Sequence, residues 1–74
     1  MELIKLTNNW WQVVVDEKTI LECPNIETAA DVLIEFKVAD KAIDEALCDI
    51  HALGHNRAIF GVNGTFIFSE SKRL

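Results

Sequence analysis

Residues 58–68 read AIFGVNGTFIF and decide the fold. Two short apolar runs flank Asn63 and Gly64, which both accept the positive φ of a two-residue type I′ turn. We therefore expect a β-hairpin closed by this pair, with the two apolar runs as its strands. The same register places Arg57 opposite Glu70, which makes an attractive pair of charges across the strands.

Both faces of this hairpin are apolar, so each face has to be covered. Alternate residues of a strand point to opposite sides, and the pattern does not decide which side meets the rest of the protein. We expect the more aromatic side to enter the core and the other side, where Phe60 pairs with Ile67, to meet a partner. The expected core residues are Ile59, Phe66 and Phe68, and the expected contact residues are Phe60, Val62 and Ile67.

The first part of the chain alternates apolar and polar residues in the manner of β-strands. Asn8 and Asn9 suit a two-residue turn, which would pair Leu6 with Trp11. Pro24 ends the last of these strands, because proline cannot donate a hydrogen bond to a sheet. The predicted strands cover residues 2–7, 10–15 and 19–23.

Apolar residues spaced three and four positions apart predict two amphipathic helices after the third strand. Asn25 suits the cap of the first helix, Asp40 suits the cap of the second, and Gly54 suits the end of the second. The pattern loses its phase around residues 38–39, which favours a helical hairpin over one long helix. The apolar stripes are Ile26, Ala29, Ala30, Leu33 and Phe36 in the first helix and Ile43, Ala46, Leu47, Ile50 and Leu53 in the second.

These elements predict a single two-layer α+β domain over residues 1–74. Its antiparallel sheet follows the chain order β-β-β-α-α-β-β, with the helical pair on one face. The other face would display apolar residues of the final hairpin, and soluble monomers rarely expose such a patch. A chain of this length also buries only about 60% of its unfolded surface. We therefore expect a partner on the outward face, in the simplest case a second copy in a homodimer.

The composition limits the class of partner. The chain has 12 acidic and 7 basic residues, a net charge of −5. Nucleic-acid binding requires a basic surface, and the pair Lys72 and Arg73 is too small to supply one. No apolar run is long enough for a membrane span, and no signal-peptide pattern is visible. Two cysteines without a paired motif indicate a cytoplasmic protein with free thiols, and we expect no cofactor.

One cluster on the second helix has the chemistry of a metal site. At about 100° per residue, Asp44, Cys48 and His51 share one side of the helix, and His55 follows one turn later. Carboxylate, thiolate and imidazole groups are zinc ligands, so a small zinc-binding or catalytic protein using Cys48, His51 and His55 is the alternative to a binding protein. Because Gly54 is expected to end the helix and turn His55 away, we expect no metal here.

The loop after the second helix is the densest polar cluster between two elements. A histidine transfers protons near neutral pH, an asparagine donates hydrogen bonds and an arginine binds anions. No nucleophile with a base lies nearby, so we expect His55, Asn56 and Arg57 to recognise a partner rather than to catalyse. Structural roles are open to the same loop, because Gly54 can end the helix and Arg57 can pair with Glu70.

Trp10 and Trp11 are adjacent and therefore point to opposite faces of a strand. The predicted register makes Trp11 the core residue and Trp10 the outlying one. An exposed tryptophan is a frequent anchor of interfaces, and Trp10 can equally lie flat over a neighbouring strand. Both roles stay open.

Residues 54–66, GHNRAIFGVNGTF, resemble the C-terminal part of small uncharacterised proteins from tailed phages of marine cyanobacteria. The preceding helix pair, which ends in Ala-Leu-Gly-His, is similar in style. The resemblance implies no known activity and no catalytic residues. It implies a compact accessory protein in the cytoplasm of an infected cell, where such proteins commonly bind a host or viral protein.

We therefore predict a small acidic accessory protein that acts by protein–protein association, for instance as a phage-encoded modulator of a host protein. A third alternative is an acidic decoy that occupies a nucleic-acid-binding site of another protein. A decoy needs aligned carboxylates, and Glu27, Asp31 and Glu35 form only a short row.

Overall fold

The structure is a computed structural model and describes residues 1–72. Arg73, one half of the predicted basic pair, lies outside the described residues. The α+β class and the predicted order of elements are confirmed. The elements are β1 (Glu2–Lys5), β2 (Trp11–Val15), β3 (Lys18–Cys23), α1 (Ile26–Glu35), α2 (Asp40–Leu53), β4 (Arg57–Phe60) and β5 (Phe66–Glu70).

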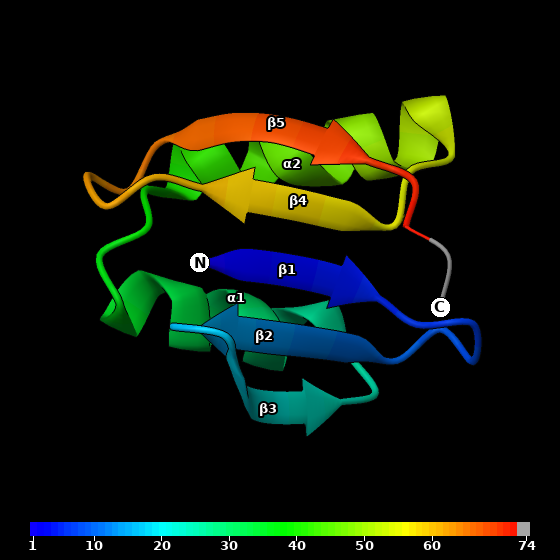
Figure 1. Cartoon of the computed structure of the whole chain (residues 1–74), viewed down its shortest axis with the longest axis horizontal. Helices are drawn as coiled ribbons and strands as arrows, with labels where there is room; N and C mark the ends of the chain where they lie inside the picture. Colours follow the sequence, from blue (N-terminus) through cyan, green and yellow to red (C-terminus); the bar gives the residue numbers. More distant parts are fainter. Residues whose placement is uncertain (73–74) are drawn as a thin grey trace.

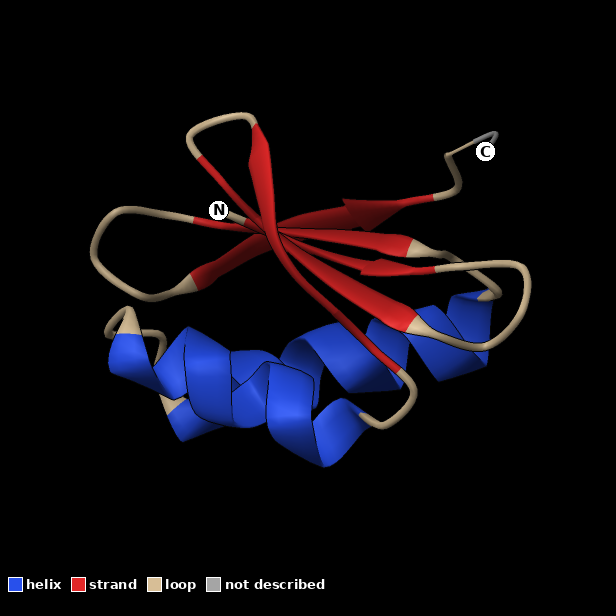
Figure 2. Ribbon diagram, turned by 90° about the horizontal axis from the view of Figure 1, so that it is seen from below, coloured by secondary structure: helices blue, strands red, loops and turns tan. Residues whose placement is uncertain are grey.

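The strands form one antiparallel sheet in the order β3-β2-β1-β4-β5, with β1 at its centre (Figure 1). Both helices lie on one side of this sheet and leave its other side open (Figure 2). α1 packs against β2 and β3, whereas α2 packs against β4 and β5. The sheet therefore has two halves, each with its own helix, and β1 joins β4 at the boundary between them.

The helix ends follow mostly from local sequence. Asn25 caps α1 as predicted, because its Oδ1 accepts a hydrogen bond from the Thr28 backbone N–H at 2.9 Å. Asp40 is the first residue of α2 rather than its cap, and the cap position belongs to Ala39, whose side chain cannot accept a hydrogen bond. Gly54 ends α2 in the left-handed region, at φ 68°, as predicted. In the described chain, neither helix is long and apolar enough to cross a membrane.

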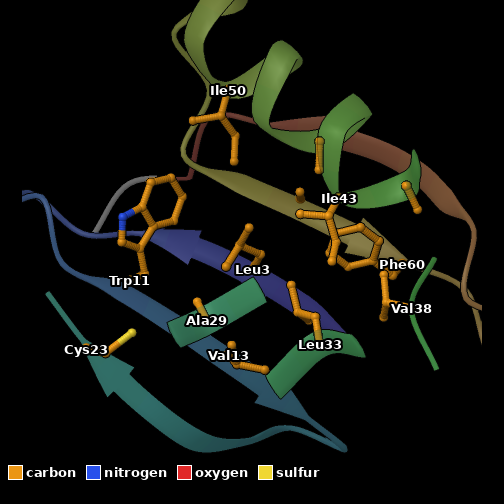
Figure 3. Close-up of a cluster of buried hydrophobic side chains, with 13 residues drawn as sticks. Leu3, Trp11, Val13, Cys23, Ala29, Leu33, Val38, Ile43, Ile50 and Phe60 are labelled. Atoms are coloured by element: carbon orange, nitrogen blue, oxygen red, sulfur yellow. The ribbon is translucent and has the colours of Figure 1, made fainter. Parts of the chain in front are cut away.

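The core lies between the helices and the inner face of the sheet (Figure 3). Leu3, Val13 and Leu33 are its largest fully buried side chains. The predicted stripes supply Ala29 and Leu33 from α1 and Ile43, Ala46 and Ile50 from α2, and Ile26, Ala30 and Leu47 pack against them half-buried. Phe36 and Leu53 are exposed, contrary to the prediction. Each lies ten positions after the first residue of its stripe, roughly 80° away around the helix, so it leaves the buried side.

The hairpin of β4 and β5 has the predicted outer register but a different turn. Arg57 pairs with Glu70 and Ile59 with Phe68, as expected, whereas Phe60 pairs with Phe66. The Gly61 N–H donates to the Thr65 carbonyl at 2.8 Å, and the Gly64 N–H donates to the Gly61 carbonyl at 3.0 Å. The loop therefore has one residue more than a type I′ turn, with only Gly64 at positive φ, the pattern of a tight turn followed by a glycine bulge.

The side of β4 that was expected to face outward is the buried one. Phe60 enters the core with 3% of its surface exposed, and its ring meets the edge of Phe66 at a centroid distance of 6.2 Å. Phe68, which was expected in the core, is 47% exposed on the opposite side. The predictions that Phe60 faces outward and that Ile59 and Phe68 enter the core are therefore wrong. Phe66 packs against the core as expected, because the extra loop residue places it on the same side of the hairpin as Phe60. Ile67 and Val62 are exposed, as expected.

The β1–β2 hairpin closes with the same kind of loop. The Leu6 N–H donates to the Trp10 carbonyl at 2.7 Å and the Asn9 N–H donates to the Leu6 carbonyl at 3.0 Å, with Asn9 at φ 68°. Trp11 consequently pairs with Lys5 instead of Leu6. The register is shifted by one residue, so Leu3 rather than Ile4 joins Trp11 in the core.

The two-residue turn of the fold lies between β2 and β3 instead. Val15 pairs directly with Lys18, and both intervening residues have positive φ, 50° at Asp16 and 67° at Glu17. These are the signs that a type I′ turn requires, on residues that adopt them less readily than glycine.

Candidate functional site

The sheet side away from the helices, called the open face below, mixes apolar and charged residues. Strand pairing arranges its side chains in two rows that cross the whole sheet. The first row is Thr19, Val14, Glu2, Ile59 and Phe68, and the second is Glu22, Gln12, Ile4, Arg57 and Glu70. Among the apolar residues of these rows, Ile4 at the centre is buried, and only Phe68 at the β4–β5 end is largely exposed, beside its partner Ile59.

Arg57 occupies the middle of the open face and holds two carboxylates. Its Nε donates to Glu2 and its Nη1 donates to Glu70, the residue predicted to pair with it. The hydrogen bond from Arg57 lowers the pKa of Glu2, and the two carboxylates raise the pKa of Arg57. Arg57 therefore ties β1 and β5 to β4 across the open face.

His55 belongs to a series of hydrogen-bonded side chains that the sequence did not predict. Its Nδ1 lies 2.6 Å from the Ser69 Oγ, and the Ser69 hydroxyl donates to the Asp49 carboxylate at 3.2 Å. With the serine proton directed to Asp49, Nδ1 carries the hydrogen and Ser69 accepts it. The serine stands between the other two groups, so this order links α2, the loop and β5 and does not place a base to activate the serine.

Asn56 also has an intramolecular role. Its Nδ2 donates to the Lys72 carbonyl and its Oδ1 accepts from the Lys72 N–H, both at 2.6 Å. Together with Arg57 and His55, every polar residue of the predicted recognition loop has a partner within the chain. Their recognition of another protein stays a prediction.

Trp10 lies in the β1–β2 loop and is 39% exposed. Its backbone N–H donates to the Asn8 Oδ1 at 3.0 Å, which holds the loop closed. Trp11 is in the core, so the division of roles between the two tryptophans is confirmed. The role of Trp10 as an interface anchor stays a prediction.

A cleft of about 380 Å³ opens between the β1–β2 loop and the carboxyl-terminal end of α2. Both segments lie at the right-hand end of the molecule in Figure 1. The cleft unites His51 of the predicted helix cluster with His55 of the loop, and it adds Lys5 and Asn9 from a distant part of the sequence. Its lining residues are Lys5, Leu6, Thr7, Asn9, Ile50, His51, Gly54, His55 and Asn56.

The predicted zinc ligands do not assemble. Within residues 1–72, no group of three or more His, Cys, Asp or Glu side chains is placed to hold a metal ion. Cys48 is an exposed free thiol, while His51 and His55 face the cleft that Asp44 and Cys48 do not line. The zinc-binding alternative therefore has no ligand set among the described residues, because Gly54 ends the helix before His55.

No protein-family model, curated protein or solved structure matches the chain. The likeness of residues 54–66 to phage accessory proteins stays a prediction. The open face, the free edge of β5 and the cleft are candidate surfaces for a function.

Proposed function

We propose that the protein acts by protein–protein association and that its first partner is a second copy, joined through the free edge of β5. β5 is the last strand of the sheet, so one side of its backbone has no strand beside it. Next to this edge, Ile67 is 58% exposed and Phe68 is 47% exposed. An edge strand with large exposed apolar side chains is a template for another strand. This is the observation that carries the proposal.

The opposite edge of the sheet has features that discourage such pairing. β3 begins at Lys18, carries an irregularity opposite Val13 and Val14, and is followed by Pro24. Lysine, a bulge and proline are the devices by which natural sheets protect an edge. β5 also has an irregularity in its pairing with β4, but its sequence, FIFSE, contains neither lysine nor proline.

A contact between two β5 strands is self-complementary, because an antiparallel pair of identical strands has a two-fold axis. The two sheets would then form one continuous sheet, with Phe68 of each copy in the strand beside the axis and Ile59 one strand further away. The irregularity beside Phe66 shortens the regular part of β5, so few backbone hydrogen bonds are added. We therefore expect a small interface and a dimer that dissociates on dilution.

The test is the solution mass by sedimentation equilibrium over a wide concentration range. Ile67→Lys places a charge at the β5 edge, and Ile20→Lys is the matched control, because Ile20 is also an exposed isoleucine but lies on β3. The wild type and Ile20→Lys should dimerise with increasing concentration, while Ile67→Lys stays a folded monomer.

Two results contradict the proposal. A wild-type mass that stays monomeric at every concentration excludes the homodimer. A dimer that Ile20→Lys disrupts and Ile67→Lys leaves intact places the interface elsewhere. Circular dichroism of each variant separates loss of association from loss of folding.

A further inference from the structure

The cleft beside α2 has a charge opposite to that of the whole protein. The chain carries 12 acidic and 7 basic residues. Of the described residues that line the cleft, none is Asp or Glu, whereas Lys5, His51 and His55 are basic. In an acidic protein, a wall of this composition favours a negatively charged ligand locally.

Lys5 has no carboxylate partner among the described residues, where both ion pairs belong to Arg57. Its Nζ lies 5.9 Å from the centre of the Trp11 ring, so the aromatic face holds the ammonium group without neutralising it. Lys5 is also half-buried, and a partly desolvated charge interacts more strongly with an opposite charge than one in bulk water.

The other polar side chains of the cleft are either held in place by a hydrogen bond within the protein or have no such bond in the described residues. The bond between His55 Nδ1 and Ser69 fixes the imidazole ring, and Nε2 has no hydrogen-bond partner within residues 1–72. The side chains of Thr7, Asn9 and His51 likewise form no hydrogen bond in this part of the chain and can turn to a ligand. Asn56 is held at both ends of its amide by Lys72 and serves as a fixed wall.

We infer that this cleft binds a small organic phosphate. A phosphate dianion has several acceptor oxygens and up to two negative charges, which suits Lys5 and two imidazoles better than the single charge of a carboxylate. The volume of about 380 Å³ lies at the small end of ligand sites and leaves room for an organic group against Leu6 and Ile50. The carboxyl-terminal dipole of α2 opposes an anion, and the Lys5 ammonium group offsets this repulsion.

The test is an NMR titration with phenyl phosphate, using benzoate as a carboxylate ligand with the same ring. Phenyl phosphate should shift the amide signals of the cleft residues at millimolar concentration, and benzoate should bind about tenfold more weakly because it carries less charge. Lys5→Gln should weaken phenyl phosphate binding about tenfold, since it removes one close charge pair. Lys18→Gln changes the net charge equally on distant β3 and should leave the affinity unchanged.

His51→Gln is a second variant that keeps the core intact, because His51 is exposed. It should weaken binding several-fold even if Lys5→Gln proves unstable through its contact with Trp11. The inference is overturned if phenyl phosphate shifts no cleft signals, if benzoate binds as tightly, or if Lys18→Gln weakens binding as much as the cleft variants do. The result is independent of the dimer, because Ile67→Lys should bind phenyl phosphate like the wild type.

Discussion

The two halves of the sheet close their hairpins with the same loop and use it differently. In β1–β2 and in β4–β5, three residues lie between a pair joined by one backbone hydrogen bond, Leu6 with Trp10 and Gly61 with Thr65. The third loop residue donates a second hydrogen bond to the carbonyl of the first residue of that pair. The middle residue of each loop is an asparagine whose Oδ1 accepts from the backbone N–H two residues later. Two unlike sequences, TNN and VNG, thus give one backbone geometry.

The difference lies in the residue at positive φ. In the second loop this is Gly64, whose carbonyl accepts from the Ala39 N–H at 3.0 Å and whose Cα packs on the linker between the helices. In the first loop it is Asn9, which lines the cleft. Gly64 allows the β4–β5 loop to pack closely against the linker between the helices, whereas the β1–β2 loop with Asn9 borders the cleft.

The largest expected effect on stability concerns which face of the β4–β5 hairpin is buried. Phe60→Ala should lower the free energy of unfolding by about 3–5 kcal/mol, because it removes a buried ring from the core. Phe68→Ala, on the open face of the neighbouring strand, should lower it by less than about 1 kcal/mol under conditions where the protein is monomeric. Urea unfolding measures both. Similar losses for the two variants would contradict the register that separates them.

The second prediction compares the loops directly. A Cβ on Gly64 would lie 2.1 Å from the Lys37 carbonyl oxygen, and the residue is at φ 81°. Gly64→Ala should therefore destabilise the fold by about 2–4 kcal/mol, through backbone strain and the displaced linker. Asn9→Ala adds no atom that could clash and should lower the free energy of unfolding by about 1 kcal/mol, mostly because alanine is less favourable than asparagine at positive φ. Thermal unfolding of the pair tests the difference, and equal losses would mean that the second loop does not dock on the helices.

The third prediction concerns the joint between the halves, where Arg57 of β4 holds Glu2 of β1. The hydrogen bond from Arg57 keeps the pKa of Glu2 below its ordinary value of 4.5. A carboxyl with a lower pKa in the folded state stabilises the fold above its unfolded pKa, and this contribution is lost as the pH falls through the folded pKa. Glu2→Gln should cost about 1 kcal/mol at neutral pH, and the difference from the wild type should vanish in strong acid. A difference that persists in acid would mean that the loss has another origin.

The smallest effect on stability is expected at the two-residue turn between β2 and β3, which has no counterpart in the β4–β5 half. Asp16 and Glu17 both have positive φ between β2 and β3. Glu17→Gly removes the strain of a side chain in this region and should raise the free energy of unfolding by about 0.5 kcal/mol, after the greater entropy of glycine in the unfolded chain is subtracted. Chemical unfolding of the variant measures it. A loss of stability would indicate that Glu17 contributes more than its backbone conformation.

The sequence was sufficient to predict the helices and strands, but not the conformations of the loops between the strands. Apolar periodicity and end signals such as Asn25 and Gly54 are local, so they predicted the helices, the strands and the α+β class. The Asn63–Gly64 pair favours a two-residue turn by itself, but the docking of Gly64 on a linker far away in the sequence stabilises the longer loop. The longer loop puts Phe66 on the same side of the hairpin as Phe60, and this aromatic side faces the helices.

The cleft was harder to foresee. The sequence pattern presents His51 and His55 as candidate zinc ligands and His55 also as part of a recognition loop, but it does not indicate a common cleft. Lys5 and Asn9 join them only because β1 lies beside β4 at the centre of the sheet. Ser69 and Asp49 had no sequence signal, since a lone serine in a strand and one aspartate among many carry no pattern.

The most direct test of the central claim, that β5 is the edge through which two copies associate, is amide hydrogen exchange of both edge strands at high and low protein concentration. We expect that amides of Phe66–Glu70 that face away from β4 are protected at high concentration and lose this protection on dilution, while those at the free edge of β3 exchange rapidly at both concentrations. Ile67→Lys should remove the concentration dependence. Protection in β5 that does not change with concentration, or concentration-dependent protection in β3, would contradict association through β5.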